Sequence, residues 1–234
     1  MKVYPAFYTR VFRWALRTFL KFTLDIRVRF QEPLPPGPKV FAVNHPTVWD
    51  AFPILSFVRT DYVRTLVEEQ VWSFFVPRLI FTLANQIVLY RGEKSARSIE
   101  DALFMLARGD SVLIAPEGER TPSGQRVRAR RGVARLSVAG RAQVIPVGAW
   151  IDERDIVIRQ VRYKEEGRLY SVDSYFPRFR APYGVVFGRP LSVARYFGRE
   201  LSPEQYQGIA TRILERIYEL ETEARGLFPV RPGA

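Results

Sequence analysis

A chain of 234 residues, of which 47% are hydrophobic and 26% charged, is long enough to fold around one substantial hydrophobic core. It contains no cysteine and a single histidine, which excludes disulfides and thiol nucleophiles and argues against a zinc site. The net charge of +12 predicts attraction to polyanions, either nucleic acid or the anionic face of a membrane. Most of these cations are arginines, which either serve phosphate binding or reflect the composition of the genome.

Residues 1–31 combine aromatic and aliphatic side chains with a cation at roughly every third or fourth position, and no acid precedes Asp25. These cations exclude a membrane-spanning helix and a secretory signal with a clean apolar centre. The pattern is typical of a basic amphipathic helix that lies on a membrane surface. The alternative is a helix that packs on the protein's own core and exposes a basic face to solvent. The Pro-rich residues 32–38 cannot continue a helix, so we divide the chain into residues 1–31 and 32–234.

Residues 39–43 predict a short buried strand that leads into Asn44, His45 and, five positions after the histidine, Asp50. Pro46 suits the first turn of a helix, which we expect to run to about residue 58. Five residues are about 500° of helical rotation, so His45 and Asp50 can meet only if His45 lies at or before the first turn. The histidine would then lie where a strand ends and a helix begins, a common place for chemistry in an open α/β sheet.

An imidazole beside a carboxylate supplies two of the three members of a catalytic triad, since the carboxylate fixes the tautomer of the base. The chain offers no cysteine and no Gly-x-Ser-x-Gly elbow to complete the triad. This favours direct group transfer, in which His45 deprotonates a substrate alcohol that attacks a bound electrophile. The alternative is an ordinary histidine that has an aspartate five residues later by chance.

Strands and helices are expected to alternate after this segment, which predicts an α/β fold with a mostly parallel sheet. A capping box of Ser98 and Asp101 is expected to start one helix. We expect strands at 62–67, 86–90, 111–115 and 143–150, later strands toward a sheet edge at 156–163 and 183–187, and helices at about 98–109, 132–139 and 206–224. The apolar residues 71–83 are broken by Pro77 and Arg78, and they either pack internally or join the first segment as a platform for acyl chains.

Two of the predicted strands end in residues suited to an anionic ligand. The strand at 86–90 delivers Arg91, and the strand at 111–115 runs into a glycine-containing turn with Glu117, Gly118 and Arg120. The carboxyl ends of parallel strands share one edge of a sheet, so these side chains should lie on the same edge as His45.

Four short blocks, in this order, resemble the glycerolipid acyltransferases typified by bacterial 1-acylglycerol-3-phosphate acyltransferase. Each block is weak by itself, but the set is specific in its order and spacing. The blocks are Asn44-His45 with Asp50, Ile87 to Arg91, Pro116 to Thr121, and Val144 to Val147. The resemblance covers roughly residues 38–190. It departs from the family at Glu119, where a small hydroxyl residue is usual, and at Asn85, where a glycine is common.

The resemblance implies a mostly parallel sheet flanked by helices, with His45 as general base and Asp50 as the residue that orients it. It implies substrate-binding roles for Asn44, Arg91, Glu117, Gly118 and Arg120. Arginines at strand ends can clamp a phosphate with two parallel hydrogen bonds and hold the neighbouring hydroxyl near the base.

The expected function is that of a membrane-associated O-acyltransferase of phospholipid biosynthesis. An acyl thioester, acyl-CoA or acyl-acyl carrier protein, would be the co-substrate, and a lysophosphatidic-acid-like lipid the acceptor, with no metal, no further cofactor and no nucleic acid partner. We expect the protein at the cytoplasmic face of the cell membrane, as a peripheral or monotopic protein. The alternatives are an acyltransferase of the same fold that acts on another lysolipid or on glycerol-3-phosphate, and a non-catalytic basic module that binds membrane or nucleic acid.

Overall fold

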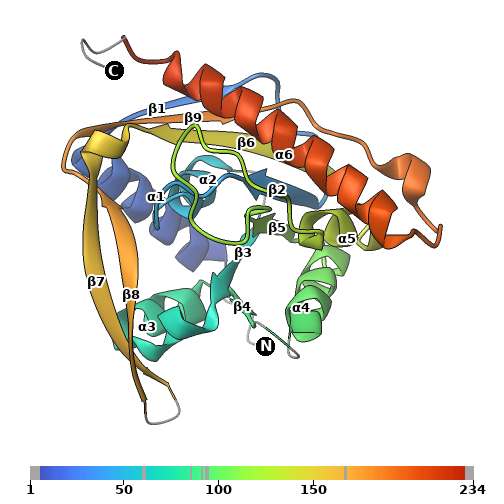
Figure 1. The fold of residues 1–234 in the computed structure, drawn as a ribbon, viewed down its shortest axis with the longest axis horizontal. Coiled ribbons are helices and arrows are strands. Elements are labelled where there is room, and N and C mark those ends of the chain that lie inside the picture. Colours follow the sequence, from blue (N-terminus) through green and yellow to red (C-terminus); the bar gives the residue numbers. More distant parts are fainter. Residues whose placement is uncertain are drawn as a thin grey trace.

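The computed structural model describes residues 6–59, 62–84, 86–90, 92, 95–165 and 168–229. They form a seven-stranded sheet with helices on both faces and a separate two-stranded hairpin that projects from one side (Figure 1). The elements run in chain order as α1 (Ala6–Thr23), β1 (Leu24–Phe30), β2 (Lys39–Val43), α2 (Ala51–Phe57), β3 (Val63–Glu68), the 3-10 helix η1 (Glu69–Ser73), α3 (Phe75–Leu83), β4 (Ile87–Leu89), α4 (Ser95–Ala107), β5 (Ser111–Ile114), α5 (Gly132–Ala139), β6 (Gln143–Ile151), η3 (Glu153–Asp155), β7 (Ile156–Glu165), β8 (Arg168–Pro177), β9 (Ala181–Phe187), η4 (Ala194–Tyr196) and α6 (Pro203–Arg225).

The large sheet has the strand order β1-β9-β6-β2-β5-β3-β4. Neighbouring strands run parallel throughout, except that β9 is antiparallel to β6. The predicted α/β fold with a mostly parallel sheet is therefore confirmed. Because β2, β5 and β6 are buried on both faces, they appear in the sequence as continuous apolar runs.

The hydrophobic core has two layers, one on each face of this sheet. Successive side chains of a strand point to opposite faces, so Val40 and Ala42 of β2 contact the layer under α4, α5 and α6, while Phe41 and Val43 contact the layer under α1 and α2. Helix α6 approaches the sheet closely at Gly148, where a β-carbon would lie 2.2 Å from a backbone nitrogen of the helix.

The ends of many elements meet along one side of the sheet, at the carboxyl ends of its central parallel strands. The parallel strands β2, β5, β3 and β6 all end there, and the antiparallel β9 begins there, as does β1, which runs parallel to β9. Helix α1 ends at the same edge, because Thr23 directly precedes β1. The turns that follow β2 and β5 therefore lie beside one another and beside the end of the first helix.

Two strand predictions were wrong or incomplete. Residues 24–30, predicted to belong to the N-terminal helical segment, form the edge strand β1. Strand β9 lies second from that edge, between β1 and β6, which agrees with its predicted place toward a sheet edge. Strand β7 pairs with β8, which the sequence did not predict, in a hairpin apart from the large sheet.

Two predicted helix starts were also wrong. Pro46 lies in an irregular turn, and α2 begins only at Ala51. Ser98 does not cap a helix: it is buried inside α4, where its hydroxyl accepts a hydrogen bond of 2.8 Å from the backbone N–H of Tyr90. Residues 71–83 contribute to η1 and α3, and they leave Leu79 and Ile80 exposed. Among the described residues, no helix has both the length and the hydropathy needed to cross a bilayer.

Candidate active site

The His45–Asp50 pair lies in the turn between β2 and α2, as the sequence predicted. The imidazole Nδ1 is 2.7 Å from Asp50 Oδ2. A carboxylate accepts hydrogen bonds, so Nδ1 is the donor and the lone pair of the imidazole is on Nε2. The His45 side chain is 36% exposed whereas that of Asp50 is 2% exposed, so a substrate can reach the imidazole but not the carboxylate.

The Asp50 carboxylate is held by three further donors besides His45. The backbone N–H of Thr47 lies 3.0 Å from Oδ2, and the Thr47 hydroxyl lies 2.8 Å from Oδ1. The Tyr183 hydroxyl, from the start of β9, also donates to Oδ1. The Thr47 hydroxyl in turn accepts the backbone N–H of Trp49. Asp50 is thus fixed in place by its own turn and by a distant strand.

Asn44 joins this turn to β6 through two hydrogen bonds. Its buried amide donates to the carbonyl oxygen of Ala149 at 2.8 Å and accepts from the N–H of Ala149 at 2.7 Å. The structure therefore shows a positioning contact for Asn44, and its substrate-binding role stays a prediction.

Glu117 and Gly118 form the turn after β5 and support the His45 segment. The buried Glu117 carboxylate accepts the backbone N–H of His45 at 2.6 Å and bonds to the side chain of Tyr218 from α6. Gly118 has a left-handed backbone with φ +77°, and a β-carbon there would lie 2.8 Å from Cγ of Arg130. Glycine is thus required both by the conformation and by the packing.

Arg120 connects the turn after β5 with the His45 turn and with the hairpin. Its Nε donates to the carbonyl oxygen of Pro46 at 2.9 Å, and one terminal nitrogen donates to Glu153 at 2.6 Å. The guanidinium carbon lies 4.0 Å from the ring centroid of Tyr175 on β8. These bonds use two of the five N–H groups of the fork. Glu119, the departure from the family pattern, is exposed.

Arg91, which we predicted to bind the substrate, lies outside the described residues. Glu68, the last residue of β3, contributes to the electrostatic field at His45. The structure thus brings His45, Asp50, Asn44, Glu117, Gly118 and Arg120 together at one edge of the sheet.

The comparison with protein families decides the class of this site. The model of the family described as Acyltransferase matches residues 25–150, which include both turns of the site. The chain belongs to the acyltransferase family. Among curated proteins, none matches its sequence.

The acyltransferase also shares its fold with a solved structure. The crystal structure of the 1-acyl-sn-glycerophosphate (LPA) acyltransferase PlsC from Thermotoga maritima superposes with a TM-score of 0.65. The two sequences are 17% identical, and the match covers 94% of this chain and 84% of that protein. At this identity the likeness shows that the two proteins have the same fold.

The electrostatics of the acyltransferase site raise the pKa of His45, Glu117 and Tyr183. Burial lowers the pKa of the His45 imidazole, but the hydrogen bond and charge of Asp50, with Glu117 and Glu68, leave it above its ordinary value of 6.5. Burial raises the pKa of Glu117 to about 7, although hydrogen bonds from His45 and Tyr218 lower it. Burial beside Asp50 raises the pKa of Tyr183 well above its ordinary value, so the phenol stays a donor.

The sequence did not indicate three residues that support this site: Thr47, Tyr183 and Tyr218. Thr47 lies within the His-Asp segment, and a hydroxyl three residues before an aspartate is a common turn pattern, so local spacing could have found it. Tyr183 is 133 residues from Asp50 in the sequence. Its signal is weaker: a tyrosine in the apolar run 183–187 needs a polar partner when it is buried.

Proposed function

We propose that this acyltransferase is an O-acyltransferase that moves a fatty acyl group from a thioester to a hydroxyl of a lysophosphatidic-acid-like acceptor. The observation that carries the proposal is the His45–Asp50 pair, in which Nδ1 of the partly exposed His45 side chain donates to the carboxylate and leaves Nε2 as the base. The sequence has no cysteine to act as nucleophile, which favours direct attack by the acceptor.

In this mechanism His45 Nε2 takes the proton of the acceptor hydroxyl as the oxygen attacks the thioester carbonyl. The new C–O bond forms and gives a tetrahedral intermediate with a negative oxygen. The C–S bond then breaks, and the thiolate leaves with the proton of the imidazolium, which returns His45 to its neutral state. Asp50 stabilises the imidazolium between the two steps, as expected for a carboxylate bonded to Nδ1.

The substrate assignments rest on chemistry and on the solved relative. The T. maritima protein is described as an LPA acyltransferase, and the acceptor proposed here has the same phosphate and free hydroxyl. Arg91, Gly118 and the remaining N–H groups of Arg120 are the proposed phosphate ligands, in line with the preference of guanidinium groups for phosphate. Acyl-CoA and acyl-acyl carrier protein both supply the thioester, so the reaction needs no further cofactor.

We also propose that the protein works at the cytoplasmic face of the membrane as a peripheral or monotopic protein. Helix α1 supports this proposal because its outward side exposes Val11, Trp14, Phe19 and Phe22, with Arg10 and Lys21 beside them. An apolar stripe next to cations is the surface that an anionic bilayer binds.

The test is turnover of lysophosphatidic acid in vesicles with palmitoyl-CoA or palmitoyl-acyl carrier protein, compared with glycerol-3-phosphate. We expect phosphatidic acid as the product, and a loss of at least about 100-fold in the His45→Ala protein with an unchanged melting temperature. If product formed from glycerol-3-phosphate but not from lysophosphatidic acid, the acceptor would be glycerol-3-phosphate. No product from any acceptor, with a folded protein that binds anionic vesicles or DNA, would favour the non-catalytic module.

A further inference from the structure

An exposed turn between β8 and β9 places a phenylalanine between two arginines. Phe179 is 67% exposed, and the flanking Arg178 and Arg180 are also exposed. A large apolar side chain held out in water between two cations is the arrangement found where a protein meets a lipid headgroup layer.

This turn is attached to the end of α1, the helix proposed to lie on the membrane. The N–H of Arg180 donates to the carbonyl oxygen of Thr23 at 2.6 Å, and the Arg180 guanidinium donates to the carbonyl oxygen of Lys21 at 3.3 Å. The ring of Phe179 packs edge to face on Phe22, with the centroids 5.7 Å apart, although Phe22 itself is 69% exposed. The two phenylalanines therefore form one exposed aromatic pair from segments far apart in the sequence.

The backbone of the turn is strained at one residue, Arg180. Arg180 has φ 60°, the left-handed conformation that non-glycine residues adopt at a cost of roughly 1 kcal/mol or more. A glycine there would form the turn without strain but would lack the cation. The exposed guanidinium is instead held at the end of α1 by its bond to Lys21, beside the exposed pair of Phe22 and Phe179.

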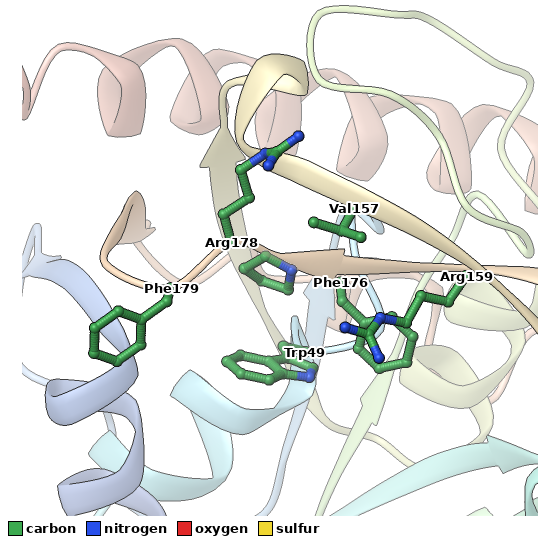
Figure 2. Close-up of a pocket in the computed structure, with 7 residues that line it drawn as sticks. Trp49, Val157, Arg159, Phe176, Arg178 and Phe179 are labelled. Carbon is green, nitrogen blue, oxygen red and sulfur yellow. The ribbon is translucent and has the colours of Figure 1, made fainter.

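An apolar hollow opens beside the turn. Its volume is about 600 Å³, and Trp49, Val157, Phe176 and Pro177 line it together with Phe179, while Arg159 and Arg178 supply cations (Figure 2). Figure 2 shows the Phe179 ring beside helix α1, Phe176 and Arg159 on the opposite side, and Trp49 between them. Apolar walls next to guanidinium groups match the chain and the phosphate of an anionic phospholipid.

We propose that the Arg178-Phe179-Arg180 turn is a second membrane-contacting element, which inserts Phe179 into an anionic bilayer beside the exposed face of α1. This inference rests on the membrane association proposed above. It goes beyond it because it assigns the contact to a segment some 155 residues after α1 and predicts which single side chains control it.

The test measures binding of the full chain to vesicles of phosphatidylcholine and phosphatidylglycerol (3:1) by flotation. Burying the exposed two-thirds of a phenylalanine ring contributes enough that Phe179→Ser should lower the partition coefficient roughly 5- to 30-fold. The matched control is Phe104→Ser on α4, since Phe104 is 54% exposed and Arg108 lies over its ring at 5.6 Å. The control should bind as the original protein does.

The variant Arg180→Gly tests whether the charge of the turn contributes to membrane binding independently of folding. It relieves the left-handed strain and loses the 3.3 Å side-chain bond to Lys21, but it keeps the backbone bond to Thr23, so the turn stays attached to α1 and the melting temperature should change little. Binding to the anionic vesicles should fall several-fold, and binding to pure phosphatidylcholine should not change. The proposal is overturned if Phe179→Ser binds like the original protein, or if the Phe104 control loses as much. If the original chain itself does not bind these vesicles, membrane association fails as well, and the result is then distinct from a failure of the turn alone.

Discussion

His45 should titrate above its ordinary pKa because Asp50, Glu117 and Glu68 together stabilise its imidazolium by more than burial disfavours it. The neutral imidazole is the active base, so kcat/KM should rise with pH and level off above a midpoint higher than 6.5. His45 is the single histidine of the chain, so its ring protons give the pKa by NMR without an assignment problem. An NMR midpoint below 6.5 in the folded protein would contradict the electrostatic description.

Tyr183 is expected to act on catalysis through Asp50, although it does not face the substrate. Tyr183→Phe removes the donor to Asp50 Oδ1 without changing the shape of the core. With one donor fewer, the negative charge of Asp50 acts more strongly on the imidazolium, so the acid limb of the kcat/KM profile should move to higher pH. The turnover at neutral pH should fall about 3- to 30-fold, because more of His45 is protonated and Asp50 is less well oriented.

The control for this prediction is Tyr196→Phe, whose hydroxyl bonds to Arg212 away from the site. It should leave the NMR titration of His45 and the rate profile unchanged. A purely structural role for Tyr183 would lower the melting temperature and the rate at all pH values alike, with no shift of the His45 midpoint.

Glu117 gives the stability of the fold a dependence on pH. Burial raises its pKa to about 7 from an ordinary 4.5, so its stabilising contribution is complete below about 4.5 and is lost as the pH rises through about 7. A Glu117→Gln protein should lack this loss, and relative to it the original protein should lose up to about 3 kcal/mol of unfolding free energy over this range. Melting temperatures of both proteins from pH 4.5 to 8 measure the difference. If the two melting temperatures differed by the same amount at every pH, the pKa of Glu117 would not be raised in the folded protein, which would contradict this prediction.

At the scale of elements, the sequence predicted best where burial is symmetric. Strands β2, β5 and β6 lie between two layers of helices and therefore appear as continuous apolar runs. Strand β1 alternates apolar residues with Asp25, Arg27 and Arg29 at the edge of the sheet, and the cations made it look like the end of a basic helix. Strand β1 has one buried residue in seven whereas all five residues of β2 are buried, so the sequence of β1 lacks the continuous apolar run that identifies a central strand.

The residues of the candidate site also differ in how well the sequence predicted them. His45 and Asp50 are five residues apart, and the need for them to meet in one turn could be argued from local geometry. Tyr183 and Tyr218 join the site from β9 and α6, and nothing in their local sequence states which loop they reach. The end-of-strand argument did place Glu117 and Arg120 at the correct edge, but it could not predict that Glu117 turns inward to the His45 backbone.

Arg120 joins three elements, and its loss should affect their packing. Arg120→Ala removes the bonds to Pro46 and Glu153 and the stacking on Tyr175, so we expect a melting temperature several degrees lower. Glu153→Gln should cost less, roughly 0.5 to 1 kcal/mol, because the Glu153 side chain is 44% exposed and water screens the ion pair. An unchanged melting temperature of Arg120→Ala would contradict this connecting role.

The same variant decides whether Arg120 also binds the acceptor. If its remaining N–H groups bind phosphate, the Michaelis constant for lysophosphatidic acid should rise much more than that for the thioester. Arg120→Lys should recover part of this loss, since an ammonium keeps the charge but not the planar fork. Equal impairment for both substrates would leave Arg120 with a structural role only.

At the scale of the whole molecule, the site and the proposed membrane surface meet at one edge of the sheet. Helix α1 ends at the edge where the turn after β2 begins, and the ring of Phe19 on its outward side lies 5.2 Å from that of Trp49, the neighbour of Asp50. Leu20 of α1 is fully buried and Leu16 packs against the same core cluster, so α1 is part of the fold and not a detachable anchor. A truncation through residue 30 would remove an edge strand, and single exposed side chains are the sharper test.

Trp14 is such a side chain, exposed on α1 and clear of the core. If α1 presents the acyltransferase to lipid, Trp14→Ser should lower turnover of long-chain lysophosphatidic acid in vesicles several-fold, because tryptophan contributes strongly at the membrane interface. The same variant should keep its turnover, within about two-fold, on a short-chain lysophosphatidate held below its critical micelle concentration, because that acceptor reaches His45 from water. The melting temperature should not change, since an exposed substitution usually costs less than about 0.5 kcal/mol. Equal losses on both acceptors would mean that Trp14 supports the active site itself, and no loss on either would remove α1 from membrane docking.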